Sequence, residues 1–395
     1  MNSISQIYEI SMMNLRNIPQ RLGTSLVIVI GIAGVVTVLV ALLAMAEGFR
    51  HTLASTGKED FAIVLRSGAT DELSSGFDRD QALVIAQAPG VRKNASGLAL
   101  ASPERYVLTN LVNRKNNEPS NVPVRGVDAI AFEVRPSFKI VEGRMFATGA
   151  REVIVGRNVS KQFSHTAVGD ELPVRDGDWK VVGIFENGGD VHESEVWTDR
   201  ATLSGVLRSN SVASLQVQLE NAAAFDTFKT ALANDPRVNV EAKRQSTYYA
   251  AQSQATGTFI TVLGTIVASI MALGAIFAAL NTMYSAVSTR TVEIATLRAI
   301  GFGSLPVVAS VLLEALALAL LGGIAGGLIA YVLFNGFTVS TLNFQTFSQV
   351  AFAFRVTPGL LVQGLIWALF IGFIGGLMPS WRAARMPVTV ALRAA

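Results

Sequence analysis

The side chains best suited to chemistry lie in one short run, Asp190-Val-His192-Glu193-Ser-Glu195, directly after the turn residues Gly188-Gly189. Carboxylate and imidazole groups are common metal ligands, so this run is a candidate metal site. Acidic residues beside a Gly-Gly turn are, however, more typical of a solvated loop. The three histidines of the chain are scattered, without metal-ligand spacing. We therefore expect a solvated loop here and no metal ion.

Motifs for catalysis are also missing from the sequence. There is no G-x-S-x-G or H-E-x-x-H pattern, and Ser, His and Asp occur only as scattered residues. The chain has no cysteine, which excludes disulfides and thiolate metal sites. A phosphate-binding G-x-x-x-x-G-K-[ST] loop is absent as well. We expect no enzymatic activity and no cofactor bound by this chain.

The most informative short stretch runs from Asn281 to Gly301. Ile294, Leu297 and Ile300 recur at i, i+3 and i+6, with charged residues elsewhere, and glycines at 301 and 303 end the pattern. This spacing predicts a short amphipathic helix lying across a membrane surface, suited to docking a cytosolic partner. A plain helical hairpin turn would not need so long a loop of mixed polarity. The candidate docking residues are Arg290, Glu293, Ile294, Leu297, Arg298 and Gly301.

Glu314 interrupts an otherwise apolar segment that starts near Pro306. It lies about 12 Å along a helix from that start, at 1.5 Å per residue. A carboxylate at membrane depth is a functional candidate. We favour an ion pair with an arginine such as Arg298 or Arg382. The alternatives are a side chain that reaches the interface, and a proton or substrate site.

Glycines recur at helix-packing spacing in the last two apolar segments. Small residues four apart allow two helix backbones to approach closely in a membrane. The spacing leaves open whether such contacts lie within one chain or across a dimer. These residues are Gly322, Gly323, Gly326, Gly327, Gly372, Gly375 and Gly376.

Four apolar segments would position Glu314, the glycines and the loop at 286–304. Half of the 395 residues are hydrophobic and only 15% are charged, against about 25% in a typical soluble domain. The predicted transmembrane helices cover residues 24–46, 257–285, 305–337 and 357–379, the last closed by Pro379. The charge-free run after Arg244 predicts one long helix whose first turns lie outside the lipid. The first segment could instead be a cleavable signal peptide, but 23 uncharged residues exceed the usual 7–15.

Arginine placement gives an orientation. Basic residues flank the first segment at its start, lie between the second and third, and follow the fourth, whereas the loop at 338–356 has only Arg355. By the positive-inside rule, the leader (1–23), the loop at 286–304 and the tail (380–395) are cytoplasmic. The segment 47–256 and the loop 338–356 are then outside. The basic pI is explained by these arginines, so nucleic acid is not an expected partner.

The segment 47–256 has the composition of a soluble domain, with 24 Lys and Arg and 26 Asp and Glu. Its pattern predicts a mixed α/β domain with helices at 79–88, capped by Asp78, and at 222–233. The predicted strands are 61–66, 106–111, 122–127, 153–155, 180–185, 196–198, 215–219 and 238–242. The leader places Ile4, Ile7, Tyr8, Met12 and Leu15 near one helical face, which predicts an interfacial amphipathic helix.

At this point the sequence resembles the MacB/FtsX-type family of ABC transporter permeases, which includes the lipoprotein-releasing type. The family's loop pattern N-x-M…R-x-x-E-I-x-x-L-R-A-x-G is matched at Asn281, Met283, Arg290, Glu293, Ile294, Leu297, Arg298, Ala299 and Gly301. Glu314 with the glycine-rich run after it, and the tail Gly376…Pro379…Ala383-Ala384…Pro387…Ala391-Leu392-Arg393, also look like the family. So do Glu142–Phe146, Glu152–Gly156, Val168–Asp170 and Val181–Ile184 in the soluble domain, which resemble the periplasmic core.

The resemblance implies four transmembrane helices, a MacB-like periplasmic core, and a dimer with a second permease copy or paralogue in the inner membrane. MacB carries a fused ATPase domain, so here ATP and Mg are expected in a separate cytosolic ABC ATPase that contacts the 286–304 loop. The expected function is mechanotransmission, in which ATP hydrolysis moves the extracytoplasmic domain to export or extract a lipid, lipoprotein, peptide or amphipathic compound. A periplasmic adaptor or outer-membrane partner would fit this function, as would contact with membrane lipid. One alternative is an FtsX-like regulator of a cell-wall hydrolase that moves no cargo; another is an ATP-independent receptor or anchor.

Overall fold

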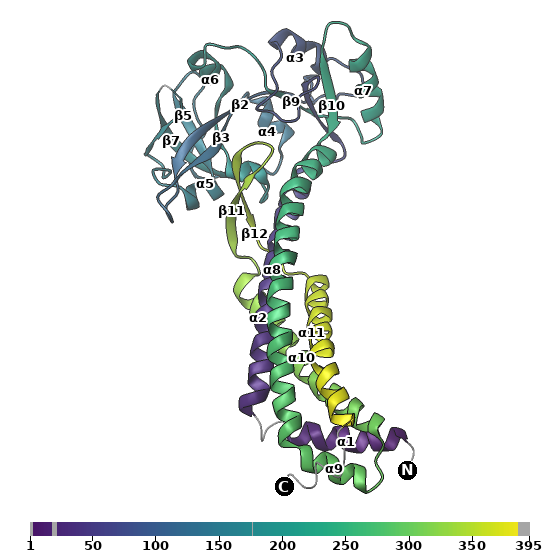
Figure 1. Ribbon diagram of the computed structural model, residues 1–395. Coiled ribbons are helices and arrows are strands. Elements are labelled where there is room, and N and C mark those ends of the chain that lie inside the picture. Colours follow the sequence, from purple (N-terminus) through teal and green to yellow (C-terminus); the bar gives the residue numbers. More distant parts are fainter. Residues whose placement is uncertain (1–2, 18–21, 176, 386–395) are drawn as a thin grey trace. The chain divides into compact units, whose positions relative to one another are not determined.

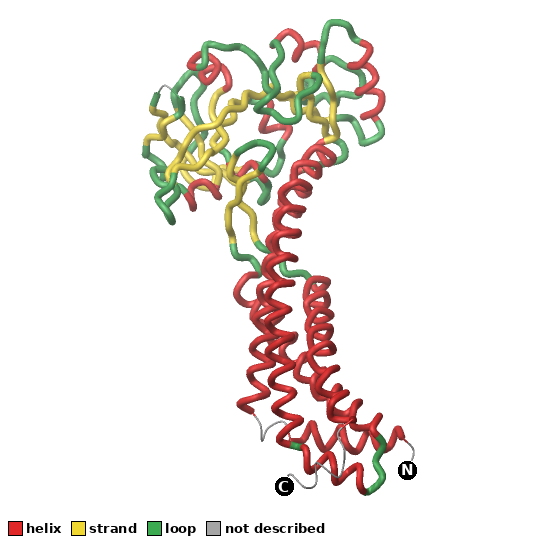
Figure 2. Tube along the Cα trace, viewed as in Figure 1, coloured by secondary structure: helices red, strands yellow, loops and turns green. Residues whose placement is uncertain are grey.

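The computed structural model describes residues 3–17, 22–175 and 177–385, which form two compact units (Figures 1 and 2). The helical unit comprises residues 1–47, 259–337 and 354–395, and the mixed α/β unit comprises 48–258 and 338–353, each as far as it is described. The predicted tail residues Pro387, Ala391, Leu392 and Arg393 lie outside the described residues.

Long apolar helices make up the helical unit and run side by side in Figure 1. Four helices have the length and hydropathy to cross a membrane. They are α2 (Leu22–Thr56), α8 (Gln245–Thr289), α10 (Ser304–Phe334) and α11 (Pro358–Arg385). Two shorter helices, α1 (Ser3–Asn17) and α9 (Thr291–Ala299), lie crosswise at one end of this bundle. α8 is continuous over 45 residues, which confirms the predicted long helix.

One local expectation for the helical unit was wrong. α11 does not end at Pro379 but continues to Arg385, with Pro379 buried among its neighbours. A proline is tolerated inside a transmembrane helix because adjacent helices can satisfy the freed backbone groups. The leader also has a protein surface to pack on: α1 contacts α10, Ile10 and Ser11 are buried, and Tyr8 is 61% exposed.

A single mixed sheet of ten strands organises the α/β unit. Its order is β10-β1-β9-β2-β3-β8-β5-β7-β4, with β6 paired to β7. The neighbours are antiparallel except β3 with β8 and β5 with β7. The strands are β1 (Phe61–Arg66), β2 (Ala101–Val112), β3 (Pro119–Val127), β4 (Lys139–Gly143), β5 (Glu152–Gly156), β6 (Glu171–Pro173), β7 (Asp178–Glu186), β8 (Val196–Asp199), β9 (Ser214–Gln218) and β10 (Val240–Arg244).

The long strand β2 joins two lobes of this sheet. Its first residues, 101–104, pair with β9, and the remainder pairs with β3. α3 (Arg79–Ala86) and α7 (Ala224–Asn234) pack with β1, β9 and β10 around Ile85 and Phe228. The other lobe contains α4 (Ile130–Val134), α5 (Arg157–Gln162), the 3-10 helix η2 (Val191–Ser194) and α6 (Arg200–Val206). Trp179 and Trp197 are fully buried in this second lobe.

The segment predicted only as a loop at 338–356 contains a β-hairpin that belongs to the α/β unit. It consists of β11 (Thr338–Asn343) and β12 (Ser348–Ala353) in antiparallel pairing. The hydroxyl of Ser194 accepts a hydrogen bond from the Ala351 amide at 3.0 Å. Asn121 Nδ2 donates to the Phe347 carbonyl at 3.0 Å. Residues far apart in sequence therefore complete one folded unit.

The strands and helices predicted for segment 47–256 are all present within a few residues of their expected ends. Short elements were missed, namely α4, α5, α6, β4 and β6, because five or so residues give too little periodicity to recognise. Asp78 occupies the N-cap position of α3, but its side chain makes no capping hydrogen bond, so the predicted cap was wrong in that respect.

Candidate functional site

The predicted docking helix is α9, which follows α8 after the single residue Arg290. Ile294 and Ala295 are buried, whereas Glu293 is exposed and Leu297 and Arg298 are half-buried. The predicted apolar face was wrong at Ile300, which is 71% exposed and lies after the last helical residue. Gly301 follows with φ +102°, a left-handed conformation that favours glycine and ends the helix.

Arg290 and Glu314 form a buried ion pair between the start of α9 and α10. Nη1 of the arginine lies 2.8 Å from Oε2 of the glutamate, and Nη2 lies 3.3 Å from Oε1. Their side chains are 6% and 7% exposed. We expected Arg298 or Arg382 as the partner, and this was wrong, although an ion pair is present. Two charges held away from water stabilise a structure only while both are present.

A pocket beside this pair is lined mainly by apolar side chains, with Ser310 and Glu293 as its other polar members. The apolar side chains come from α1, α8, α9 and α10. These side chains are Ile10, Met13, Met283, Val287, Ile294, Leu297, Val307 and Val311. Since the local medium is apolar, the attraction between the two charges is stronger than it would be at a protein surface.

The glycines predicted as packing residues lie against other helices of the same chain. Gly322 and Gly326 of α10 face α2, and Gly323 and Gly327 face α11. A Cβ at Gly326 would lie 2.9 Å from Val36 Cβ, and one at Gly376 would lie 2.6 Å from Ala315 Cβ. Both distances are shorter than side-chain carbons tolerate. Gly372 also faces α10, while Gly375 faces Ala279 of α8.

A second buried charge cluster lies in the α/β unit, around Arg125 of β3. Its guanidinium group contacts Glu72 at 2.7 Å, Glu104 at 2.6 Å and Glu195 at 2.7 Å. Arg135 adds a second cation 2.7 Å from Glu104. Only 1% of the Arg125 side chain is exposed, so the cluster is sealed from water. The sequence analysis missed it because the partners are 53, 21 and 70 residues away along the chain.

Burial and Arg125 act in opposite directions on the ionisation of two neighbours. Burial alone would raise the pKa of Glu72, but the charge and hydrogen bonds of Arg125, with a hydrogen bond from Ser214, outweigh burial and hold that pKa below the usual 4.5. Burial raises the pKa of Tyr106, whose ring lies 4.9 Å from the Arg125 guanidinium carbon, so this phenol stays neutral. A carboxylate with a lowered folded pKa contributes stability that is present above the unfolded value and is lost as the pH falls.

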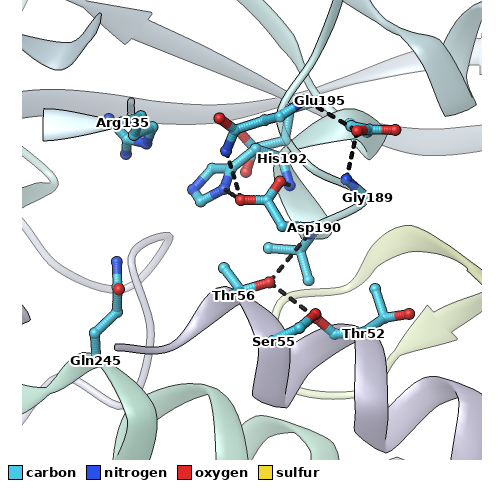
Figure 3. A network of polar contacts seen from close by, with 12 residues as sticks. Thr52, Ser55, Thr56, Arg135, Gly189, Asp190, His192, Glu195 and Gln245 are labelled. Carbon is cyan, nitrogen blue, oxygen red and sulfur yellow. Dashed lines mark hydrogen bonds and ion pairs between the residues drawn. The ribbon is translucent and has the colours of Figure 1, made fainter. Parts of the chain in front are cut away.

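The run Asp190–Glu195 is buried, so the prediction of a solvated loop was wrong. The exposed fractions of Asp190, His192 and Glu193 are 9%, 2% and 6%. Figure 3 shows the carboxylate of Asp190 beside the His192 ring, with Oδ2 and Nδ1 2.8 Å apart. Glu193 accepts hydrogen bonds from the amides of residues 187 and 189, which closes the Gly-Gly turn. Within the described residues, no three His, Asp or Glu side chains are grouped as metal ligands.

Comparisons with known proteins bear on both units. Residues 22–235, more than half of the chain, match the MacB-like periplasmic core domain, and residues 265–388 match the FtsX-like permease C-terminal domain. The chain belongs to the MacB/FtsX family of ABC transporter permeases. The predicted family and the predicted fold class, four membrane helices with a mixed α/β domain, are therefore confirmed. This permease is a multi-pass protein of the inner membrane.

Individual relatives are distant in sequence. The macrolide export ATP-binding/permease protein MacB of Vibrio parahaemolyticus is 23% identical over 93% of this chain and 57% of its own length. The protein of the same name from Escherichia coli is 26% identical over 94% of this chain and 58% of its own length. The permease thus spans less than two thirds of these relatives. The extracellular domain of the noncanonic ABC-type transporter YknZ is 17% identical, with a TM-score of 0.35 over 46% of this chain and 99% of that domain.

Proposed function

We propose that this permease converts ATP binding and hydrolysis, performed by an ABC ATPase, into movement of its extracytoplasmic domain. The ATPase, with its ATP and Mg, is a separate cytosolic subunit that docks on residues 286–304. Residues 47–256 lie outside the membrane, and both termini lie in the cytoplasm. Arg290, Arg298, Arg382 and Arg385, all near one end of the helical bundle, support this orientation through the positive-inside rule.

The buried pair of Arg290 with Glu314 carries the coupling part of the proposal. α9 is short and, apart from Ile294 and Ala295, has little buried surface to hold it in place. The pair fixes the residue at which α9 begins to the middle of the cytoplasmic half of α10. A displacement of α9 then moves α10 as well, because the connection between the two is not flexible.

α8 provides the second element of transmission. It is one unbroken helix from Gln245 to Thr289, about 68 Å long at 1.5 Å per residue. Its first residues belong to the α/β unit and its last residues reach Arg290. A helix of this kind resists bending because its hydrogen bonds are all within the segment, so it is suited to act as a lever.

The cargo is a lipid, lipoprotein, peptide or amphipathic compound taken from the outer leaflet or the periplasm. Few polar side chains occur in the predicted spans 24–46, 257–285, 305–337 and 357–379, which argues against an aqueous channel for a hydrophilic cargo. The named relatives export macrolides, which are amphipathic compounds, and this supports the same broad class. The working unit is a dimer with a second copy or paralogue, completed by a periplasmic adaptor or an outer-membrane partner.

An FtsX-like role is the second candidate, because residues 265–388 match the FtsX-like C-terminal domain. In that role the permease transmits the ATPase state to a cell-wall hydrolase and moves no cargo. Recovery of a peptidoglycan hydrolase with the full-length chain, cross-linked in cells, would favour this role. Recovery of an adaptor or outer-membrane protein would favour export.

The coupling proposal is tested in proteoliposomes that contain the permease and its ATPase. Glu293→Ala and Arg298→Glu alter the charged surface of α9. Glu9→Ala is the matched control, since Glu9 is also exposed and lies on α1 at the same end of the bundle. We expect each α9 variant to lower permease-stimulated ATPase activity at least about fivefold, corresponding to ~1 kcal/mol, with normal insertion. Wild-type stimulation and transport in both variants would refute the assignment.

A further inference from the structure

A small polar cavity lies inside the α/β unit, apart from the residues proposed for coupling. Its volume is about 100 Å³, enough for three or so water molecules or one small ion. It is bounded by the last turn of α2, the first residue of α8, β9 and the segments that flank α4 and η2. The residues that carry the argument are Lys58, Arg135, Asn187, His192, Gln216 and Gln245.

Several polar atoms of these side chains are buried without a hydrogen-bond partner. They are Nη1 of Arg135, Nε2 of Gln216, Nε2 of His192 and Oδ1 of Asn187. The four residues are 0% to 7% exposed. A buried donor or acceptor left without a partner costs about 1–3 kcal/mol. Four such atoms on residues that line one cavity therefore point to a guest that the cavity is built to hold.

The direction of the hydrogen bonds fixes which atom of Gln216 is free. The backbone amide of Lys58 can only donate, so the Gln245 atom 3.2 Å from it is the acceptor Oε1. Gln245 then donates from Nε2 to Oε1 of Gln216 at 3.3 Å. The remaining Gln216 atom is Nε2, a donor, and it has no partner in the described structure.

The acidic groups beside the cavity are already occupied. Asp190 accepts from Nδ2 of Asn187 at 2.5 Å, from the His192 amide at 3.0 Å, and lies 2.8 Å from Nδ1 of the same histidine. Glu104 lies against Arg135 and Arg125. Figure 3 shows the His192 ring pointing away from this contact, toward the side on which Arg135 and Gln245 lie. Of the unused atoms, Nη1 of Arg135 and Nε2 of Gln216 are donors, Oδ1 of Asn187 is an acceptor, and Nε2 of His192 can donate only when the ring is protonated. Exposed Lys58 adds a cation to the lining.

We propose that this cavity binds a small oxyanion, a carboxylate or phosphate group, through Arg135, Gln216 and Lys58. Guanidinium and amide donors that converge on a water-poor site are the groups that recognise such oxygens. The ligand joins residues of α8, β9 and the loops next to η2 and α4. The cavity shares no residue with the proposed ATPase-docking loop at 286–304, so anion binding can be tested independently of the coupling function.

The test is isothermal titration calorimetry on the full-length permease in detergent. Sodium acetate and sodium phosphate are titrated separately, and sodium chloride keeps the ionic strength constant. We expect saturable binding of at least one anion. Acetate binding alone would assign a carboxylate of a small acid or chain terminus, and phosphate binding alone would assign a phosphate group. Gln216→Glu keeps the oxygen that accepts from Gln245 but adds a negative charge, and should weaken binding at least tenfold.

Lys58→Met is the second variant, because Lys58 is exposed and its removal leaves the buried network intact. It should weaken binding severalfold, whereas Lys161→Met, an exposed lysine on α5 away from the cavity, should leave binding unchanged. If Gln216→Glu does not fold, the comparison of Lys58→Met with Lys161→Met still tests whether the cavity binds the anion. No saturable heat with either anion, or equal binding in Lys58→Met and Lys161→Met, would overturn the proposal and assign the cavity to water.

Discussion

Breaking the Arg290–Glu314 pair gives the sharpest test of how α9 is held. Glu314→Gln keeps the size and one acceptor oxygen of the side chain but removes its charge. At 2.8 Å and an effective dielectric constant of 20, the lost attraction amounts to about 6 kcal/mol. Measured losses on removing one partner of a buried pair are about 3–5 kcal/mol, since the other charge stays buried. We expect a loss in that range for Glu314→Gln and for Arg290→Met.

A double-mutant cycle separates the pair from general packing. The double variant Arg290→Met/Glu314→Gln leaves no unpaired charge, so its loss should be at least about 3 kcal/mol smaller than the sum of the single losses. Arg385→Met is the matched control, because Arg385 is exposed near the end of α11 and its guanidinium carbon lies 4.6 Å from the centre of the Trp381 ring. Its loss should stay below ~1 kcal/mol.

The assay is reversible unfolding of the full-length permease in mixed micelles, followed by tryptophan fluorescence, with ATPase stimulation measured on the same preparations. Single variants no less stable than Arg385→Met, or single losses that simply add, would refute the reasoning. A double variant that recovers stability without recovering ATPase stimulation would show that the charges serve transmission beyond holding the fold. Recovery of both would assign the pair a structural role alone.

Three further outcomes follow from other contacts. Gly326→Val should cost at least about 1–3 kcal/mol, because a Cβ there meets Ala33 O and Val36, whereas Gly274→Ala, with open space around it, should cost less than ~1 kcal/mol in the same unfolding assay. Arg125→Met should lower stability by about 3–5 kcal/mol, because three buried carboxylates lose the cation that they share and only Glu104 keeps another, Arg135. The free energy of unfolding of the wild type should fall as the pH drops below about 4.5, because Glu72 has a lowered pKa in the folded state. Glu72→Gln should make the free energy of unfolding less dependent on pH in this range. Unfolding measured between about pH 3 and pH 6 checks both.

The long helices of this protein and its strands of clear pattern could be predicted from the sequence. An apolar run of 20 or more residues has few alternatives to a membrane helix, so all four long helices were expected. Strands such as Phe61–Arg66, rich in β-branched and aromatic residues, were recognised within a residue or two of their ends. The continuity of α8 was predicted from the absence of charged residues between Arg244 and Arg290.

Buried charge was not predictable in the same way. Arg125 and its three glutamates are isolated residues in the sequence, and only the folded sheet brings β2, β3 and the segment before β8 together. The segment Asp190–Glu195 was expected to be solvated because acidic residues are usually exposed. It packs instead against the β11–β12 hairpin, a segment that was expected only as a loop. For Glu314, several arginines were equally plausible partners until the helix ends were known.

The position of Arg290 explains why this arginine, and not Arg298 or Arg382, pairs with Glu314. It is the only residue between the end of α8 at Thr289 and the start of α9 at Thr291, with φ −103° and ψ 15°, outside helical geometry. Any change in the angle between these helices must therefore rotate its backbone. Its side chain is held by Glu314 from α10, 24 residues away, so the rotation is opposed by a buried charge and not by solvent. A joint free to turn would let α9 follow a docked ATPase alone. A joint held in this way would make α8 and α10 move with α9, which is what the coupling that we propose requires.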